Sequence, residues 1–208
     1  MNTPTILQKL RLLGSAAISD AKGGKDVLYY KVKLRTHDDH LIAGIAETVH
    51  ILQKSLSPVR AIFNECKKRV GESIVLVIDA SGIDGAVWGE IFTRYALNAN
   101  IIGCVIDGGV RDLSVIRKLK FPIWAKYVTP RVITGEWATT FSKGFELERQ
   151  VNTAVVCGGI LIRPNDFILA DADGVIVVRP EEAEHVLQKA EEIRQMEEMM
   201  MDELQKKK

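Results

Sequence analysis

The chain has 208 residues, of which 47% are hydrophobic and 26% are charged, a composition typical of soluble globular proteins. This composition excludes disordered chains, collagen-like repeats and disulfide scaffolds, and the length predicts one domain that spans residues 1–208. The 28 Lys and Arg residues nearly balance the 27 Asp and Glu residues. Because the net charge is only +1, we expect no nucleic-acid partner.

The cysteines, Cys66, Cys104 and Cys157, are far apart in the sequence and form no Cys-x-x-Cys pair. We expect them to be free thiols in a reducing compartment. The amino terminus lacks an apolar signal segment, and no apolar run approaches the roughly 20 residues of a membrane-spanning helix. The sequence therefore predicts a cytoplasmic protein that has no contact with membranes.

The first third of the chain begins with a predicted helix. Thr3 is expected to be its N-cap and Gly14 to end it. Residues 31–49 have a strand-like pattern, which Gly44 interrupts, and a second helix is predicted over residues 57–70.

The middle of the chain alternates between strands and helices. Uninterrupted apolar runs predict strands at residues 74–78, 101–106 and 123–127, and helices are predicted between them at 87–98 and 112–120. This alternation indicates parallel βαβ units. Because the strands are apolar throughout, we expect both faces of the sheet to be covered.

The last third of the chain changes character. A long helix is predicted from about residue 180 to 205, and Asp171–Gly174 is expected to form a hairpin turn rather than a metal loop. The apolar stripe and methionine cluster of this helix are more than one small domain can cover, so we expect an oligomer. Before it, short strands are predicted at residues 153–156, 160–163, 167–170 and 175–178.

One segment, Val105–Asp112, combines features that suit catalysis. Its Asp107–Gly109 portion predicts a turn after a buried strand, and Arg111 and Asp112 follow where a helix begins. Parallel α/β sheets bind ligands at this end of their strands. Arginine can hold a carboxylate or enolate, and aspartate can hold a hard divalent cation. The alternative is that Asp112 N-caps its helix and Arg111 is a surface residue.

A second segment, Gly85–Phe92, places small residues before a predicted helix start. Backbone N–H groups at such a helix start can bind an anion. Glu90 can help to hold a metal ion or its waters. The alternative is a tight loop that carries a solvated glutamate.

These two segments, with four others in the same order, make the chain resemble a known family. The family contains the regulator of ribonuclease activity A and the 4-hydroxy-4-methyl-2-oxoglutarate/4-carboxy-4-hydroxy-2-oxoadipate aldolases. The resemblance implies a swivelling β/β/α-type α/β domain with central βαβ units and a long C-terminal helix, assembled as a homotrimer or homohexamer with a site at the subunit interface. The other matching segments are Ile18–Ala21, Ile42–Val49, Phe121–Ala125 and Cys157–Val175.

The resemblance also implies roles for residues of the two segments. Asp112 would hold a divalent ion, Mg²⁺ or Mn²⁺, and Arg111 would contact a substrate oxygen. The backbone that includes Gly89, Ile91 and Phe92 would bind the pyruvate carboxylate of a small 2-oxo acid.

Two further acidic positions follow from the same resemblance. Glu90 stands where the aldolases have aspartate and would take that catalytic position with a side chain one methylene longer. A glutamate from the C-terminal helix of a neighbouring subunit would complete the site, with Glu191, Glu192 and Glu197 as the candidates.

The chemistry expected of this family is cleavage or decarboxylation of a short 2-oxo dicarboxylic acid to give pyruvate. Charge develops on the oxygen at carbon 2, where a metal ion and Arg111 would stabilise it. The base for an aldol step would be a water organised by the metal. The alternative is a non-catalytic regulator that binds a ribonuclease or another protein partner; Glu90, Arg111 and Asp112 favour the lyase.

Overall fold

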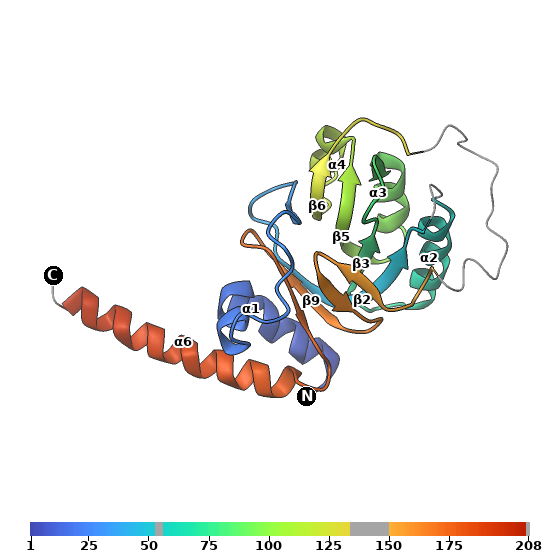
Figure 1. Ribbon diagram of the computed structural model, residues 1–208. Helices are drawn as coiled ribbons and strands as arrows, with labels where there is room; N and C mark the ends of the chain where they lie inside the picture. Colours follow the sequence, from blue (N-terminus) through green and yellow to red (C-terminus); the bar gives the residue numbers. More distant parts are fainter. Residues whose placement is uncertain (53–55, 134–149, 207–208) are drawn as a thin grey trace.

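The computed structural model describes residues 1–52, 56–133 and 150–206. Within this part of the chain, eight strands form one sheet and two more form a separate hairpin (Figure 1). The large sheet contains β1 (Lys33–Leu34), β2 (Ile42–His50), β3 (Ile74–Asp79), β4 (Ala86–Trp88), β5 (Ile101–Val110), β6 (Ile123–Val128), β9 (Phe167–Ala170) and β10 (Val175–Val178). The hairpin consists of β7 (Val155–Cys157) and β8 (Ile160–Ile162).

The strands of the large sheet follow the order β1-β6-β5-β3-β2-β9-β10, with β4 beside β5. The central pairs β2–β3, β3–β5 and β5–β6 are parallel, as the predicted βαβ units require. Val27 is bridged to Ile176 of β10, and residues 33–34 pair with β6 at the opposite edge. The segment between these pairings therefore joins the two edges into a nearly closed barrel.

Helices cover the barrel on two sides (Figure 1). One layer consists of α2 (Ser57–Lys68), α3 (Glu90–Leu97) and α4 (Leu113–Lys118), which pack on the parallel strands. The other consists of α1 (Thr3–Ala21) and α6 (Ala183–Lys206), which lie against β9 and β10. A third apolar cluster, which includes Val77, Val105 and Trp124, fills the barrel interior. The predicted α/β fold class is confirmed.

The first helix differs from its prediction at the N-cap and agrees with it at Gly14. Asn2, not Thr3, is the N-cap, and its Oδ1 accepts a hydrogen bond from the backbone N–H of Thr5 (3.0 Å). The helical backbone ends at Gly14 (φ 79°, ψ 166°), as predicted, and a second helical segment follows within α1. The helix resumes because the Asp171 carboxylate accepts hydrogen bonds from the backbone N–H (2.8 Å) and hydroxyl (2.7 Å) of Ser15. Asp171 also lies in the predicted hairpin turn between β9 and β10, which is confirmed.

Two predictions near the candidate site are wrong. Residues 86–88 form β4, so α3 begins at Glu90 instead of residue 87. Asp107–Gly109 is part of β5 and forms no turn. The glycines serve close packing instead: a Cβ atom at Gly109 would lie 2.6 Å from Tyr127 Cε2.

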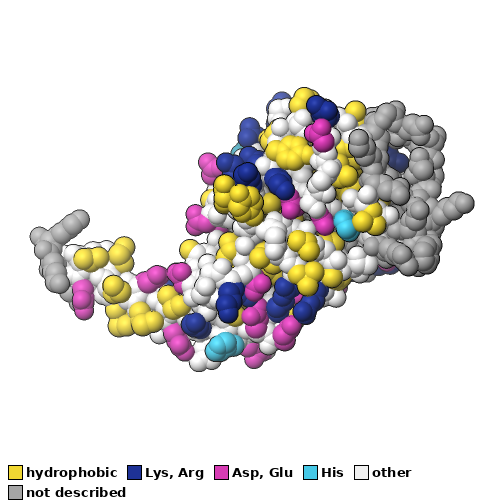
Figure 2. Space-filling view, in the orientation of Figure 1, with side chains coloured by type: hydrophobic (Ala, Val, Ile, Leu, Met, Phe, Trp, Pro, Cys, Tyr) yellow, Lys and Arg dark blue, Asp and Glu magenta, His cyan; other side chains and the backbone are white. Residues whose placement is uncertain are grey.

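Helix α6 extends past the body of the molecule (Figure 1). Its first part packs on α1, where Ala190 is buried and Arg194 donates a hydrogen bond to the carbonyl oxygen of Leu12 (2.8 Å). Residues 195–206 continue for about 18 Å at 1.5 Å per residue. Apolar side chains on this projecting part are exposed (Figure 2), namely Met196, Met199, Met200, Met201 and Leu204. In the described ranges, no helix has the length and apolar character needed to cross a membrane.

Candidate functional site

The structure brings the two predicted segments together at the carboxyl ends of β4 and β5. These strands are parallel, so the chain leaves both of them in the same direction. The backbone N–H of Arg111 donates a hydrogen bond to the carbonyl oxygen of Trp88 (3.0 Å). The start of α3, with Glu90, therefore lies beside the Arg111–Asp112 pair.

Asp112 occupies the N-cap position of α4, yet its side chain turns toward α3. Its backbone is left-handed (φ 59°, ψ 29°), and the side chain makes no capping hydrogen bond to α4, all of whose residues are described. Instead, Asp112 Oδ2 accepts a hydrogen bond from the backbone N–H of Glu90 (3.1 Å). A non-glycine residue in the left-handed region is strained, and such strain is concentrated at functional sites. The alternative in which Asp112 merely caps its own helix is therefore not supported.

Gly89 provides the space in which the Arg–Asp pair lies. Its backbone is extended (φ −164°), so its conformation alone does not require glycine. A Cβ atom at this position would, however, lie 2.5 Å from Asp112 Oδ2 and 3.1 Å from Arg111 Cγ. Any side chain at position 89 would displace the side chains of Arg111 and Asp112.

The Arg111 side chain is partly exposed and lies close to the neighbouring carboxylate. Its Nε is 3.7 Å from Asp112 Oδ2, and about 30% of the side chain is accessible to solvent. A guanidinium beside a carboxylate at a strand end can approach an anionic oxygen of a bound ligand.

The first turn of α3 offers backbone donors next to this pair. The first four N–H groups of a helix have no intrahelical acceptor, and here they include those of Ile91 and Phe92. Gly89 has no side chain to cap them, and its carbonyl oxygen accepts from Thr93 N–H (3.1 Å) and the Thr93 hydroxyl (3.0 Å). Because Phe92 is buried beside Trp88, the turn is firmly anchored.

Glu90 does not point at Asp112 but is held along its own helix. Its Oε1 accepts a hydrogen bond from Arg94 Nε (2.9 Å) and lies 2.8 Å from Arg94 Nη2 in an ion pair, one turn further along α3. The structure thus places Glu90 at the site but engages its carboxylate with an arginine that the sequence analysis did not identify.

Tyr127 is a second residue that the sequence analysis missed. Its hydroxyl donates to the carbonyl oxygen of Ile83 (2.6 Å) and accepts from the N–H of Gly85 (3.2 Å). Its ring lies against Gly109, where a side chain would clash. Tyr127 therefore connects the loop that precedes β4 to the end of β5. No sequence pattern indicates this contact, because it depends on the pairing of β5 with β6.

Charged side chains also lie at the carboxyl ends of the strands next to the site, in β2, β3, β5 and β6. Lys126 Nζ donates to Asp107 Oδ1 (2.7 Å), and His50 Nε2 lies 3.4 Å from Asp79 Oδ2. The hydrogen bond to Asp107 raises the pKa of Lys126, which keeps its ammonium protonated. A protonated amine cannot form a Schiff base with a substrate carbonyl, so Lys126 is not suited to that chemistry.

The cysteines are also unsuited to nucleophilic catalysis. All three are buried. Burial raises the pKa of the Cys66 thiol to about 12, and it likewise raises the pKa values of Cys104 and Cys157. Since the thiolate is the reactive form, these residues are inert at neutral pH.

The available carboxylates suit a magnesium ion better than a metal that requires a complete protein cage. Among the described residues, no cluster of three or more His, Cys, Asp or Glu side chains could hold a metal. Mg²⁺ commonly takes only one or two carboxylates and completes its shell with water and substrate. The Asp112 carboxylate, with 41% of its side chain exposed, meets this requirement.

The three glutamates expected from a neighbouring subunit differ in their surroundings. Glu191 forms an ion pair with Lys9 of α1 (2.7 Å), and Glu192 accepts a hydrogen bond from Gln188 (3.1 Å). Glu197 lies on the projecting part of α6. Of the three, Glu197 is therefore best placed to reach another subunit.

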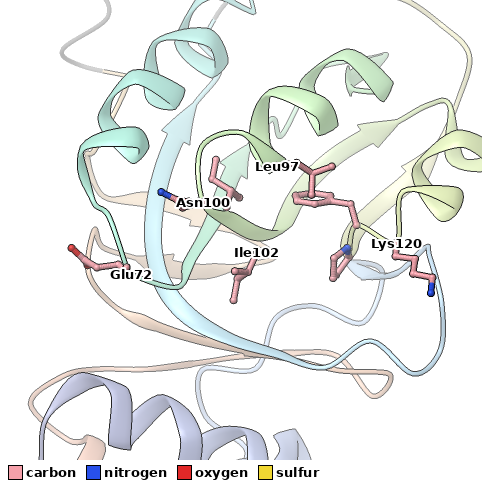
Figure 3. Close-up of a pocket in the computed structure, with 9 residues that line it drawn as sticks. Glu72, Leu97, Asn100, Ile102 and Lys120 are labelled. Carbon is pink, nitrogen blue, oxygen red and sulfur yellow. The ribbon is translucent and has the colours of Figure 1, made fainter.

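A groove of about 570 Å³ lies at the opposite, amino-terminal ends of the parallel strands (Figure 3). Glu72 and Lys120 are on opposite sides of it, and Leu97, Asn100 and Ile102 lie between them. This groove is separate from the predicted site residues.

Comparison with known proteins identifies the family of the chain. The profile of the RraA-like family, described as Aldolase/RraA, matches residues 15–177. A protein of Halalkalibacterium halodurans with a provisional 4-hydroxy-4-methyl-2-oxoglutarate aldolase name is 32% identical over 186 residues, which is 88% of this chain and 81% of that protein. The chain belongs to the RraA-like family.

Solved structures show the same fold. RraAS2 of Streptomyces coelicolor, described as an unusual member of the RNase ES inhibitor RraA family, superposes with a TM-score of 0.77 at 24% identity over 98% of this chain and 100% of that one. The RNA-processing inhibitor RraA of Thermus thermophilis superposes with a TM-score of 0.63 at 25% identity, over 79% of this chain and 91% of that one.

Proposed function

We propose that this protein is a divalent-metal-dependent carbon–carbon lyase that releases pyruvate from a short 2-oxo dicarboxylic acid. The observation that carries the proposal is the position of Asp112, whose carboxylate turns from its own helix toward the start of α3 and lies beside Arg111. Membership of a family that contains aldolases, and similarity to a relative with an aldolase name, support the same activity.

In this proposal, Asp112 holds Mg²⁺ or Mn²⁺ through its carboxylate. The ion, when bound, supplies a Lewis acid that polarises the 2-oxo group of the substrate. Backbone N–H groups of the first turn of α3, at Ile91 and Phe92, bind the substrate carboxylate next to that group. Gly89 keeps this space open.

Arg111 stabilises the charge that develops on the carbon 2 oxygen as the carbon–carbon bond breaks. The product of that cleavage is the enolate of pyruvate, so the oxygen carries more negative charge in the transition state than in the substrate. A guanidinium fixed nearby therefore contributes more to the rate than to substrate binding. Glu90 holds the water that takes part in proton transfer.

The proposed enzyme is a homotrimer or homohexamer. The exposed apolar side chains on the projecting part of α6 form a surface that packing on a neighbouring subunit would bury. Glu197 of that helix would then approach the site of the neighbour. Light scattering at micromolar concentration should show a particle several times the 23.1 kDa mass of the chain.

The decisive test combines metal removal with an Asp112→Asn variant. We expect wild-type protein with Mg²⁺ or Mn²⁺ to release pyruvate from oxaloacetate or 4-hydroxy-4-methyl-2-oxoglutarate, and a chelator to abolish the reaction. The asparagine side chain of the variant can still accept the Glu90 N–H bond but lacks the charge, so kcat/KM should fall by about a hundredfold or more, while the thermal melting temperature stays close to wild type.

A coupled assay with lactate dehydrogenase measures the pyruvate, and isothermal titration with Mn²⁺ measures the metal affinity. Full metal-dependent activity in the Asp112→Asn variant would contradict the role of Asp112. No pyruvate release by the wild type from either substrate would contradict the lyase proposal and favour a regulatory protein.

A further inference from the structure

We infer that Arg94 is a specificity-determining residue, which holds Glu90 and thereby favours decarboxylation over retro-aldol cleavage. This inference rests on the proposed function, because both reactions take place at the same site. Arg94 itself does not contact the substrate in this role. It acts through the carboxylate of Glu90, and it is therefore a positioning residue.

The geometry shows how Glu90 is engaged. Arg94 places both Nε and Nη2 on a single oxygen of Glu90, at 2.9 and 2.8 Å. The pair spans one turn of α3, with the glutamate on the amino-terminal side, which is the favourable order for such a pair. Meanwhile the backbone N–H of Glu90 is bound by Asp112, so the main chain is held at the site while the side chain is directed along the helix.

The two reactions place different demands on Glu90. In oxaloacetate decarboxylation, the bond between carbons 3 and 4 breaks, carbon 4 leaves as CO₂, and the electron pair forms the pyruvate enolate. Water then protonates carbon 3. No proton is removed before the bond breaks, so stabilisation of the enolate by Arg111 and the metal is sufficient.

Retro-aldol cleavage of 4-hydroxy-4-methyl-2-oxoglutarate requires a base. The same bond breaks and its electron pair forms the same enolate, but the hydroxyl on carbon 4 must lose its proton to become the carbonyl of a second pyruvate. That proton passes to water, and carbon 3 of the enolate is protonated in turn. A water held by the Glu90 carboxylate can accept the hydroxyl proton, and a contribution of this kind typically accelerates a reaction by about 10²–10⁴.

Arg94 competes with that water for the same carboxylate. While the ion pair persists, Glu90 is a poorer acceptor for the water, and retro-aldol cleavage is slowed relative to decarboxylation. Exposed ion pairs of this type are weak, so the expected change in the ratio of the two rates is about two- to fivefold.

The experiment measures kcat for both substrates with Mg²⁺ in the wild type, Arg94→Gln, Arg94→Lys and a control. Arg94→Gln should raise the ratio of retro-aldol cleavage to decarboxylation by about two- to fivefold. Arg94→Lys should lie between it and the wild type, since it keeps the charge but loses the planar fork. Arg11→Gln is the matched control, because Arg11 is an exposed arginine on α1.

A second comparison shows whether Arg94 acts through Glu90. In a Glu90→Gln background, Arg94→Gln should leave the ratio unchanged, whereas an effect on folding alone would persist there. Independently of activity, the Nε–H proton of Arg94 in metal-free protein, followed by its ¹⁵Nε–¹H resonance, should exchange with water about two- to fivefold more slowly in the wild type than in Glu90→Gln. An unchanged ratio in Arg94→Gln, or equal exchange rates in the wild type and Glu90→Gln, would overturn the inference.

These outcomes separate this inference from the proposed function. A wild-type enzyme that releases pyruvate from both substrates, with a ratio insensitive to Arg94, contradicts only the role of Arg94. A wild type that acts on neither substrate contradicts the lyase proposal, and with it the selectivity that Arg94 would impose.

Discussion

The two ends of the parallel sheet differ in a way that cavity size does not reveal. The amino-terminal ends border the groove of about 570 Å³, which is lined mostly by the start of β5 and by the turns that lead into β3, β5 and β6. The carboxyl ends carry Arg111, Asp112 and the first turn of α3, packed so closely that Gly89 has no room for a side chain. The proposed site is therefore identified by its convergent polar groups rather than by the size of a hollow.

The ends of α4 show the same contrast on a smaller scale. Asp112 before the helix and Lys120 after it both have left-handed backbones (φ 59° and 53°). At Lys120, this conformation only reverses the chain after the helix, as glycine commonly does. At Asp112, it directs a carboxylate toward a neighbouring helix. The same backbone conformation thus directs a candidate metal ligand at one end of the sheet and serves a chain reversal at the other.

The largest expected effect is at Arg111. Arg111→Ala should lower kcat by about 10²–10³, because it removes a donor from the developing enolate charge. Arg111→Lys should recover little, since it lacks the planar fork. Steady-state kinetics of pyruvate release with a parallel thermal melt will measure both effects. A folded variant with an unchanged kcat would exclude Arg111 from the mechanism.

Two glycine substitutions test whether close packing affects activity equally at the carboxyl and amino-terminal ends of the sheet. Gly89→Ala places a Cβ atom 2.5 Å from Asp112 Oδ2, and Gly103→Ala, near the start of β5, places one 2.5 Å from Ile42 Cδ1. Both should lose about 1–3 kcal/mol of stability from overpacking. Only Gly89→Ala should also lose about a hundredfold in kcat, because it displaces the reactive groups. Chemical denaturation and kinetics distinguish these outcomes, and equal losses of activity would contradict the comparison.

A smaller effect is expected at Tyr127. Tyr127→Phe keeps the ring against Gly109 but removes the hydroxyl bonds to Ile83 and Gly85. The free energy of unfolding should fall by about 1–3 kcal/mol, because two hydrogen bonds of about 0.5–1.5 kcal/mol each are lost. Hydrogen exchange of the amides in residues 83–92 should accelerate. Unaltered exchange there would show that Tyr127 does not hold the site loop.

The smallest effect is predicted at the opposite end of the sheet. Lys120→Gly relieves a left-handed lysine and should raise stability by about 0.5–1 kcal/mol. Because Lys120 lines the groove and not the site, kcat for pyruvate release should be unchanged. A loss of activity in this variant would assign the groove a part in the reaction.

Much of the fold was predictable from local patterns. The apolar runs before Asp79 and Asp107 indicate buried parallel strands, because short uniform apolar runs between predicted helices are typical of strands covered on both faces. The sequence pattern gave a wrong prediction where a glycine can serve either a turn or close packing. Gly108 and Gly109 indicated a turn, but they allow close approach by Ala80 and Tyr127 within a continuous strand.

The candidate site was predictable only in part. Arg111, Asp112 and Gly89 belong to contiguous motifs, so a sequence pattern identifies them. Arg94 was not predicted because an arginine one turn after a glutamate is common on helix surfaces. Tyr127 depends on which strands are neighbours in space, a property that no local pattern contains.

The projecting part of α6 has a consequence for how the chain folds. A helical segment of about 12 residues is marginal in water without tertiary contacts. Residues 195–206 extend beyond the contacts with α1, so in a single chain these turns would fray, while burial of Met196, Met199 and Leu204 between chains would order them. If the chains associate as proposed, the helix content of this protein depends on its concentration, and the last turns of α6 become ordered only on association.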